Sequence, residues 1–176
     1  MSAGGLWWRR LDQSGALLLP ARVVLAATFL WMGTNKLNEP FDFLKQLRLY
    51  HMLPTEPPIF MNATTIVLPW LEIVVGVALL LGLRLRGAAA VIAVMLCVFT
   101  PAILIRTLHI RAEEGTPFFQ IAFDCGCGTG VVTVWTKLLG NVGLLALALV
   151  AMLSRSERFC LSAWTDRPKC SVAPLG

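Results

Sequence analysis

Charged residues are scarce in this sequence. Aspartate, glutamate, lysine and arginine together make up 14% of its 176 residues, whereas 57% are hydrophobic. Average soluble proteins carry about 25% charged residues, so this chain has too few charges for a water-exposed surface of ordinary composition. Its charges also cluster between long neutral windows, a pattern typical of a protein that crosses a lipid bilayer several times. The bilayer is therefore the first partner that the sequence predicts.

Other scarce residue types exclude further classes of protein and of binding site. Five cysteines are too few for the dense disulfide framework of a small secreted domain. Only two histidines are present, so a histidine-based metal centre is not expected. The net charge of +5 comes without a basic stripe interleaved with aromatic residues, so nucleic acid is not an expected partner. What chemistry the chain performs must depend on a few polar residues near its apolar segments.

Four apolar segments are long enough to cross about 30 Å of hydrocarbon as helices, at about 1.5 Å per residue. They are predicted at residues 15–36, 63–83, 88–108 and 131–153. The fold class expected is all-α: an integral membrane four-helix bundle over residues 15–153. Residues 1–14 form a short N-terminal segment and residues 154–176 a polar C-terminal tail. Within residues 39–58, apolar and charged side chains alternate with helical spacing and predict an amphipathic helix.

Basic residues near the ends of the predicted spans indicate their orientation. Arginines cluster before the first span, between the second and third spans, and after the fourth, at Arg9, Arg10, Arg84, Arg86, Arg155 and Arg158. This bias predicts that both termini face the cytoplasm, in a bacterial-type inner membrane. Cys125 and Cys127 would then lie on the extracytoplasmic side, where disulfides persist. Cys160 and Cys170 would be free thiols in the reducing cytoplasm.

The motif Asp124-Cys125-Gly126-Cys127-Gly128 is the strongest candidate for chemistry. A disulfide between residues i and i+2 is difficult to close with favoured geometry, although the glycines relax the backbone. Such a bond would be strained and therefore oxidising. Asp124 could raise the thiol pKa by its charge or act as a proton acceptor. Three roles stay open: thiol–disulfide exchange, a structural turn, or half of a metal site.

Glu72 is the second candidate, because a carboxylate inside a membrane span is costly unless it is paired or faces a polar cavity. Lys36 at the end of the first span and Arg106 late in the third reach the same membrane face, so an ion pair with either is expected. The pattern favours a structural clamp between helices over a proton site or quinol-headgroup site beside the cysteines. Asn141 in the fourth span is expected to pair helices.

Three short motifs follow one another in an informative order: GTNKLNEP at residues 33–40, LPWLE at residues 68–72 and DCGCG at residues 124–128. Together they resemble the DoxX-like and MauE membrane proteins, over about residues 15–153. The cysteine motif is similar to that of the MauE branch, and Asn141 falls where that branch often has Arg-Asn.

The resemblance implies a four-helix membrane bundle in redox metabolism. MauE proteins are associated with methylamine utilisation and with the maturation of a disulfide-rich subunit of methylamine dehydrogenase. DoxX relatives include a subunit of a thiosulfate–quinone oxidoreductase, so a quinone is the cofactor that the resemblance suggests. Two functions are therefore expected. Either Cys125 and Cys127 serve an extracytoplasmic or membrane redox partner by thiol–disulfide chemistry, or the chain is a non-catalytic anchor of a larger redox complex.

Overall fold

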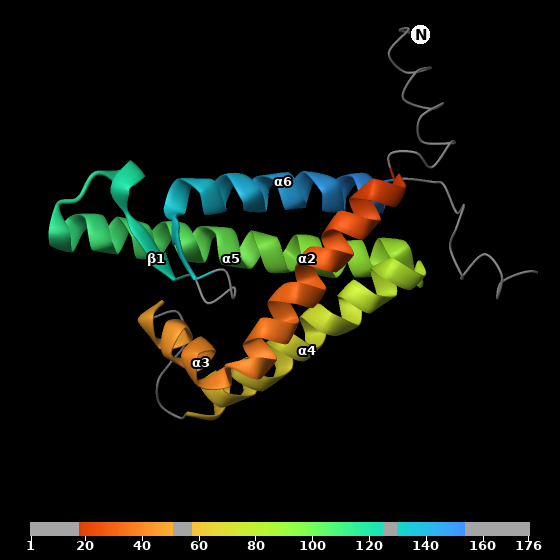
Figure 1. The fold of residues 1–176 in the computed structure, drawn as a ribbon, viewed down its shortest axis with the longest axis horizontal. Helices are drawn as coiled ribbons and strands as arrows, with labels where there is room; N and C mark the ends of the chain where they lie inside the picture. Colours follow the sequence, from red (N-terminus) through yellow and green to blue (C-terminus); the bar gives the residue numbers. More distant parts are fainter. Residues whose placement is uncertain (1–17, 51–57, 125–129, 154–176) are drawn as a thin grey trace, which may run out of the picture.

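The computed structural model describes residues 18–50, 58–124 and 130–153 (Figure 1). Within these ranges the chain forms five α-helices, one 3-10 turn and two short strands. They are α2 Leu18–Asn38, α3 Pro40–Leu49, α4 Ile59–Leu81, α5 Leu85–Glu114, η1 Phe118–Gln120, β1 Ala122–Asp124, β2 Val131–Thr133 and α6 Val134–Leu153. The segments predicted at residues 1–14 and 154–176 lie outside the described residues.

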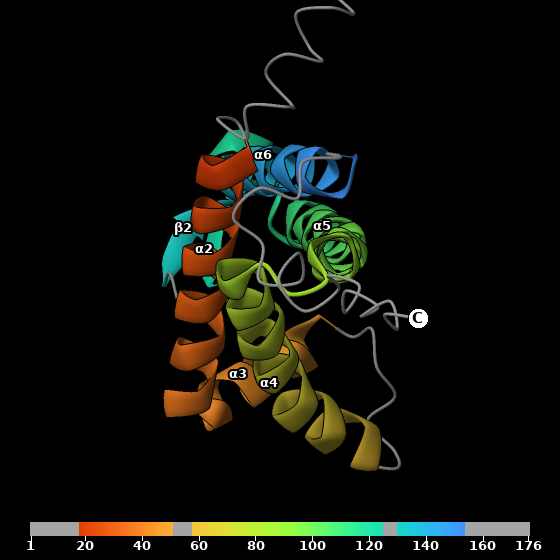
Figure 2. The ribbon, with the colours of Figure 1, turned by 90° about the vertical axis from the view of Figure 1, so that its right-hand side faces the viewer.

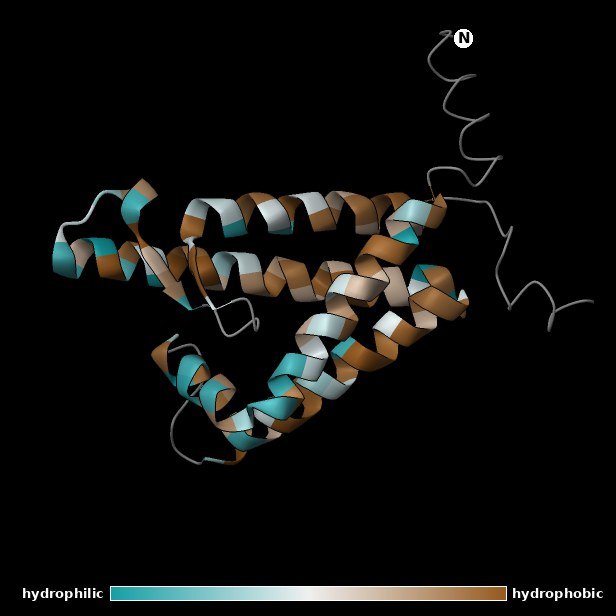
Figure 3. Ribbon diagram, viewed as in Figure 1, coloured by the Kyte–Doolittle hydropathy of each residue, from teal (hydrophilic) through white to brown (hydrophobic). Residues whose placement is uncertain are grey.

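Among the described helices, α4, α5 and α6 are long and apolar enough to cross a membrane. Their outer surfaces expose apolar side chains such as Trp70, Val94 and Leu139, and Figure 3 shows hydrophobic residues along most of their length. Helix α2 has 21 residues but carries Arg22 and Lys36, and it is not among these three. The structure therefore fits a multi-pass membrane protein, while a fourth span at α2 stays a prediction.

The four long helices form two pairs that converge at one end and diverge at the other (Figures 1 and 2). Helix α2 packs along α4, and α5 packs along α6. Helices α4 and α5 are joined by a tight turn in which Gly82 and Arg84 adopt left-handed backbone angles, φ 70° and φ 42°. The start of α2 and the end of α6 lie at this narrow end. Helix α3 and the two strands lie at the opposite, wide end.

The narrow end is filled by an apolar core that includes Leu25, Leu79, Ile92 and Ala148. Arg22 is buried beside this core, 3% exposed. Its Nε donates a hydrogen bond to the carbonyl oxygen of Leu79 at 3.1 Å, and its Nη2 to that of Leu80 at 3.3 Å. Carbonyls in the last turn of a helix lack partners within the helix, and a cation suits that end of the helix dipole. Arg22 therefore caps α4.

Helices α2 and α4 approach closely because each has a glycine at their contact. A Cβ atom on Gly33 would lie 2.9 Å from the carbonyl oxygen of Pro69, and one on Gly76 would lie 2.8 Å from a leucine side chain of α2. Small residues permit this kind of backbone approach between membrane helices. The contact places Lys36, one turn after Gly33, opposite Glu72, one turn before Gly76.

The amphipathic helix predicted within residues 39–58 is confirmed as α3. The fold is mostly helical, as expected, but it also contains an element that was not predicted: β1 and β2 form an antiparallel hairpin that pairs Ala122 with Thr133 and Asp124 with Val131. Residues 131–133 are β-branched and favour extended backbone, and pairing them with β1 satisfies backbone groups that a loop would leave to solvent. The hairpin packs on α5 and α6 through a second apolar cluster.

Candidate functional site

A buried ion pair joins α2 to α4 at the wide end of the bundle. The Nζ of Lys36 donates a hydrogen bond to Oε1 of Glu72, and the two side chains are 4% and 0% exposed. Of the two ion-pair partners expected for Glu72, the structure contains Lys36. Arg106 of α5 is not part of this pair.

The ammonium group of Lys36 is also held by two aromatic rings. Its Nζ lies 5.2 Å from the ring centroid of Phe43 on α3 and 5.8 Å from that of Phe99 on α5. At such distances the negative face of an aromatic ring attracts a cation, and more strongly where water is excluded. Helices α3, α4 and α5 therefore all contribute to holding one charge of α2.

The second carboxylate oxygen of Glu72, Oε2, is buried and has no hydrogen-bond partner among the described residues. An unsatisfied buried acceptor typically costs about 1–3 kcal/mol, and more when it is charged. Native proteins rarely leave such atoms without a protein group, a water molecule or a ligand. Oε2 is therefore the atom at this site that is available to bind something further.

Glu72 and Lys36 form the polar end of a cavity of about 280 Å³ that is enclosed by α2, α3, α4, α5 and α6. Its remaining walls are nearly all apolar and include Phe29, Met32, Leu68, Leu96, Ala102 and Ile103. Asn141 of α6 is 6% exposed and also lines this cavity. Its Nδ2 donates a hydrogen bond to Oγ1 of Thr100 at 3.3 Å, so Asn141 joins α6 to α5, in the place where a helix-pairing residue was expected.

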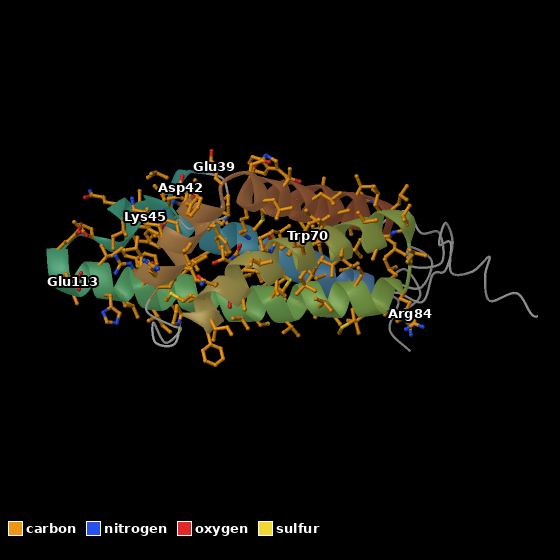
Figure 4. The ribbon with its side chains drawn as sticks, turned by 90° about the horizontal axis from the view of Figure 1, so that it is seen from below. Glu39, Asp42, Lys45, Trp70, Arg84 and Glu113 are labelled. Atoms are coloured by element: carbon orange, nitrogen blue, oxygen red, sulfur yellow. The ribbon has the colours of Figure 1, made fainter. Side chains whose placement is uncertain are left out.

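A second hollow, of about 350 Å³, is also lined by Lys36 and is mostly polar. We call it the polar cleft; its lining includes Asn35, Asn38, Glu39, Asp42, Gln46 and Asp124. Figure 4 shows Glu39, Asp42 and Lys45 next to one another at this end of the molecule. Lys36 lines both hollows. Phe43 and Gln46 of α3 also line both hollows, so the polar cleft and the apolar cavity adjoin each other at these three residues.

Cys125 and Cys127 lie outside the described residues, but the residues before and after their motif are placed. Asp124 pairs with Val131 in the hairpin and lines the polar cleft. The ring of Phe123 packs edge-on against that of Tyr50 from α3, with centroids 6.4 Å apart. Asp124 and Lys36 therefore both line the polar cleft at the wide end. Glu72 does not line the cleft but is paired with Lys36.

Sequence reasoning missed Phe43 and Phe99. Phe43 could have been found, because it is the buried residue of an otherwise exposed or half-buried amphipathic helix. Phe99 gave no signal, because it lies within a long apolar run. Within residues 18–50, 58–124 and 130–153, no three acidic, histidine or cysteine side chains are close enough together to hold a metal ion.

The family model described as "Methylamine utilisation protein MauE" matches residues 14–154 of the chain. The match includes every helix and strand of the described structure, the Lys36–Glu72 ion pair and the cysteine motif. No curated protein and no solved structure gives a significant match.

Proposed function

The chain belongs to the MauE family, and on that premise we propose that it is a membrane thiol–disulfide protein serving an extracytoplasmic redox partner. Cys125 and Cys127 supply the reacting sulfur atoms, and Asp124 is the neighbouring proton acceptor. The observation that carries this proposal is the position of Asp124. It directly precedes Cys125 in the sequence and lines the polar cleft together with Lys36 of the buried ion pair, so its carboxylate is a candidate to accept a proton from the adjacent thiol.

The proposal includes α2 as a fourth membrane span. Its two basic residues, Arg22 and Lys36, are buried against α4 and do not face outward. The side chains that α2 does expose include Leu19, Val23 and Trp31, which suit contact with lipid. With four spans and both termini in the cytoplasm, the hairpin and the polar cleft face the extracytoplasmic side of a bacterial-type inner membrane.

The proposed reaction begins with the oxidised Cys125–Cys127 pair. A thiolate of the partner attacks one of its sulfur atoms and forms a mixed disulfide. The partner's second thiolate then breaks that bond, which leaves the partner with a disulfide and this protein with a dithiol. To regenerate the pair, two electrons and two protons leave the dithiol, either to a membrane quinone, which becomes a quinol, or to an oxidised extracytoplasmic electron carrier.

The description of the family names methylamine utilisation. The first partner to test is therefore the disulfide-rich subunit of a methylamine dehydrogenase. A serine variant at both Cys125 and Cys127 should abolish disulfide formation in that subunit, measured by alkylation of its remaining thiols and mass spectrometry. Cys97→Ser is the matched control, because Cys97 lies exposed on α5. Partner disulfides that form at the wild-type rate in the double variant would refute the proposal.

A second candidate function is a non-catalytic anchor for a larger respiratory or redox complex. The observation that favours it is the exposure of large apolar side chains at the wide end, where Phe41 is 84% and Phe119 72% exposed. These side chains offer contact points for another protein. An anchor predicts that the double serine variant still assembles with its complex and supports full activity, as measured by co-purification in mild detergent.

A further inference from the structure

We infer that the apolar cavity binds an uncharged glycerolipid of the diacylglycerol type, whose free hydroxyl donates a hydrogen bond to Oε2 of Glu72. The site is built from described residues of α2, α3, α4, α5 and α6. It is therefore independent of the proposed thiol–disulfide function and involves no chemistry at the cysteines. A lipid bound there would join the α2–α4 pair to the α5–α6 pair at the wide end, where the two pairs diverge (Figure 1).

The first requirement on the ligand comes from Oε2 of Glu72. Paired with the ammonium of Lys36, Glu72 is a carboxylate, which only accepts hydrogen bonds. Its Oε1 accepts from Lys36, whereas Oε2 is buried and has no partner among the described residues. Buried polar atoms are rarely left in this state. The ligand must therefore bring a hydrogen-bond donor to Oε2.

The second requirement comes from the ammonium of Lys36. It has three N–H donors, and one of them is given to Oε1 of Glu72. The rings of Phe43 and Phe99 attract its charge but offer no oxygen atom to accept a further hydrogen bond. A ligand oxygen close to the donating group would accept one. The ligand therefore carries a donor and an acceptor a few bonds apart, as the hydroxyl and the neighbouring ester carbonyl of a diacylglycerol are.

The charges at the site disfavour lipids with charged headgroups. Lys36 and Glu72 together carry no net charge, and the remaining walls of the cavity are nearly all apolar. A phosphate group would meet the like charge of Glu72, and an ammonium headgroup would meet that of Lys36, where water is excluded. An acyl chain without a hydroxyl would leave Oε2 unsatisfied. An uncharged lipid with one hydroxyl avoids all three costs.

The size and the lining of the cavity indicate access from the bilayer. At about 280 Å³ it is at the small end of ligand pockets, which span about 300–1,000 Å³, so it suits a glycerol group with the first carbons of its chains. Leu68 of α4 and Val98 of α5 both line the cavity, and Val98 is 55% exposed. Both helices are long and apolar enough to cross a membrane. The rest of the acyl chains can therefore extend between α4 and α5 into the lipid.

The test uses the full-length protein in phosphatidylcholine nanodiscs, titrated with 1,2-dioctanoylglycerol and measured by equilibrium binding. The matched probe is 1,2-dioctanoyl-3-acetylglycerol, in which the hydroxyl is blocked by an acetyl group. The free hydroxyl should strengthen binding at least tenfold, because only this probe can donate to Oε2. Equal binding of the two probes would overturn the inference, because the ligand would then be held by the apolar walls alone.

A variant of Glu72 tests whether this atom is the acceptor. In Glu72→Gln the amide oxygen can pair with Lys36, and an NH2 group, which only donates, then replaces Oε2. The preference for the free hydroxyl should therefore disappear. Glu113→Gln, at the exposed end of α5 (Figure 4), should keep the wild-type preference. A tenfold preference that survives in Glu72→Gln would refute the assignment.

Because Glu72 also holds α2 to α4, a second variant pair leaves the ion pair intact. Val98→Trp should fill the cavity at its exposed side and weaken dioctanoylglycerol binding at least fivefold. Val94→Trp, one helical turn earlier, is 63% exposed and outside the cavity lining, so it should not change binding. Equal binding in both tryptophan variants would contradict the proposed site.

Native mass spectrometry of the protein extracted in mild detergent identifies the natural occupant. A retained diacylglycerol that is displaced by dioctanoylglycerol and lost in Val98→Trp would support the inference. A charged phospholipid that behaves in this way would overturn it.

Discussion

Helix α2 buries one cation at each end of its contact with α4, and the two are accommodated differently. At the narrow end, Arg22 donates to the backbone carbonyls of Leu79 and Leu80 in the last turn of α4. At the wide end, Lys36 pairs with a carboxylate whose second oxygen has no partner among the placed residues. The first arrangement satisfies both helices within an apolar core. The second leaves Oε2 of Glu72 without a hydrogen-bond partner among the described residues, at the wall of the apolar cavity. A buried polar atom of this kind is where a function is expected.

The largest effect should come from separating the two charges at the wide end. Glu72→Leu leaves the ammonium of Lys36 buried without its counter-ion, which typically costs about 3–5 kcal/mol. The free energy of unfolding in detergent micelles or nanodiscs measures this loss. The double variant Lys36→Met with Glu72→Leu should recover most of it, because neither charge then remains. A single variant as stable as the wild type would show that the pair is not closed in the membrane.

A smaller effect is expected at the narrow end. Arg22→Met removes two hydrogen bonds from a charged donor and should lower the free energy of unfolding by about 1.5–3 kcal/mol. Partner-disulfide formation should stay at the wild-type level, because Arg22 lines neither hollow at the wide end. Arg48→Met, at an exposed position of α3, is the control for loss of a positive charge. A loss of partner-disulfide formation in Arg22→Met would remove the distinction between the two ends.

The smallest effect should come from the glycine contact between the two ends. In Gly33→Ala the new methyl group would meet the carbonyl oxygen of Pro69, and overpacking of this kind costs about 1–3 kcal/mol. Gly140→Ala is the matched control, because no atom lies within 4 Å of its Cβ position. It should be neutral or slightly stabilising. Thermal unfolding compares the two variants, and equal melting temperatures would contradict the close approach of α2 and α4.

Much of the helical fold could be predicted, because apolar length and flanking charge are properties of single segments. The ends of the spans predicted at residues 63–83 and 131–153 lie within four residues of the ends of α4 and α6. Helix α5 continues to Glu114, beyond the predicted residue 108, because its polar last turns are still good helix formers. The hairpin was not predicted, since strands of three residues are too short to show an alternating pattern.

The candidate site could be predicted only in part. Glu72 could be identified because a carboxylate inside a membrane span is costly. Lys36 and Arg106 were its expected ion-pair partners because both are predicted to lie at the same membrane face. Choosing between them depends on how α2 crosses α4 at Gly33, which is a property of two packed helices and not of either sequence segment. The cavity depends on the divergence of the two helix pairs, and no local pattern encodes that angle.

The divergence of the two helix pairs also has a mechanical consequence. A molecule that tapers across the bilayer occupies more area in one leaflet than in the other. Lateral pressure in the leaflet that surrounds the wide end then acts to push α4 toward α5. Lipids with small headgroups, which raise the pressure among acyl chains, should narrow the gap between these helices.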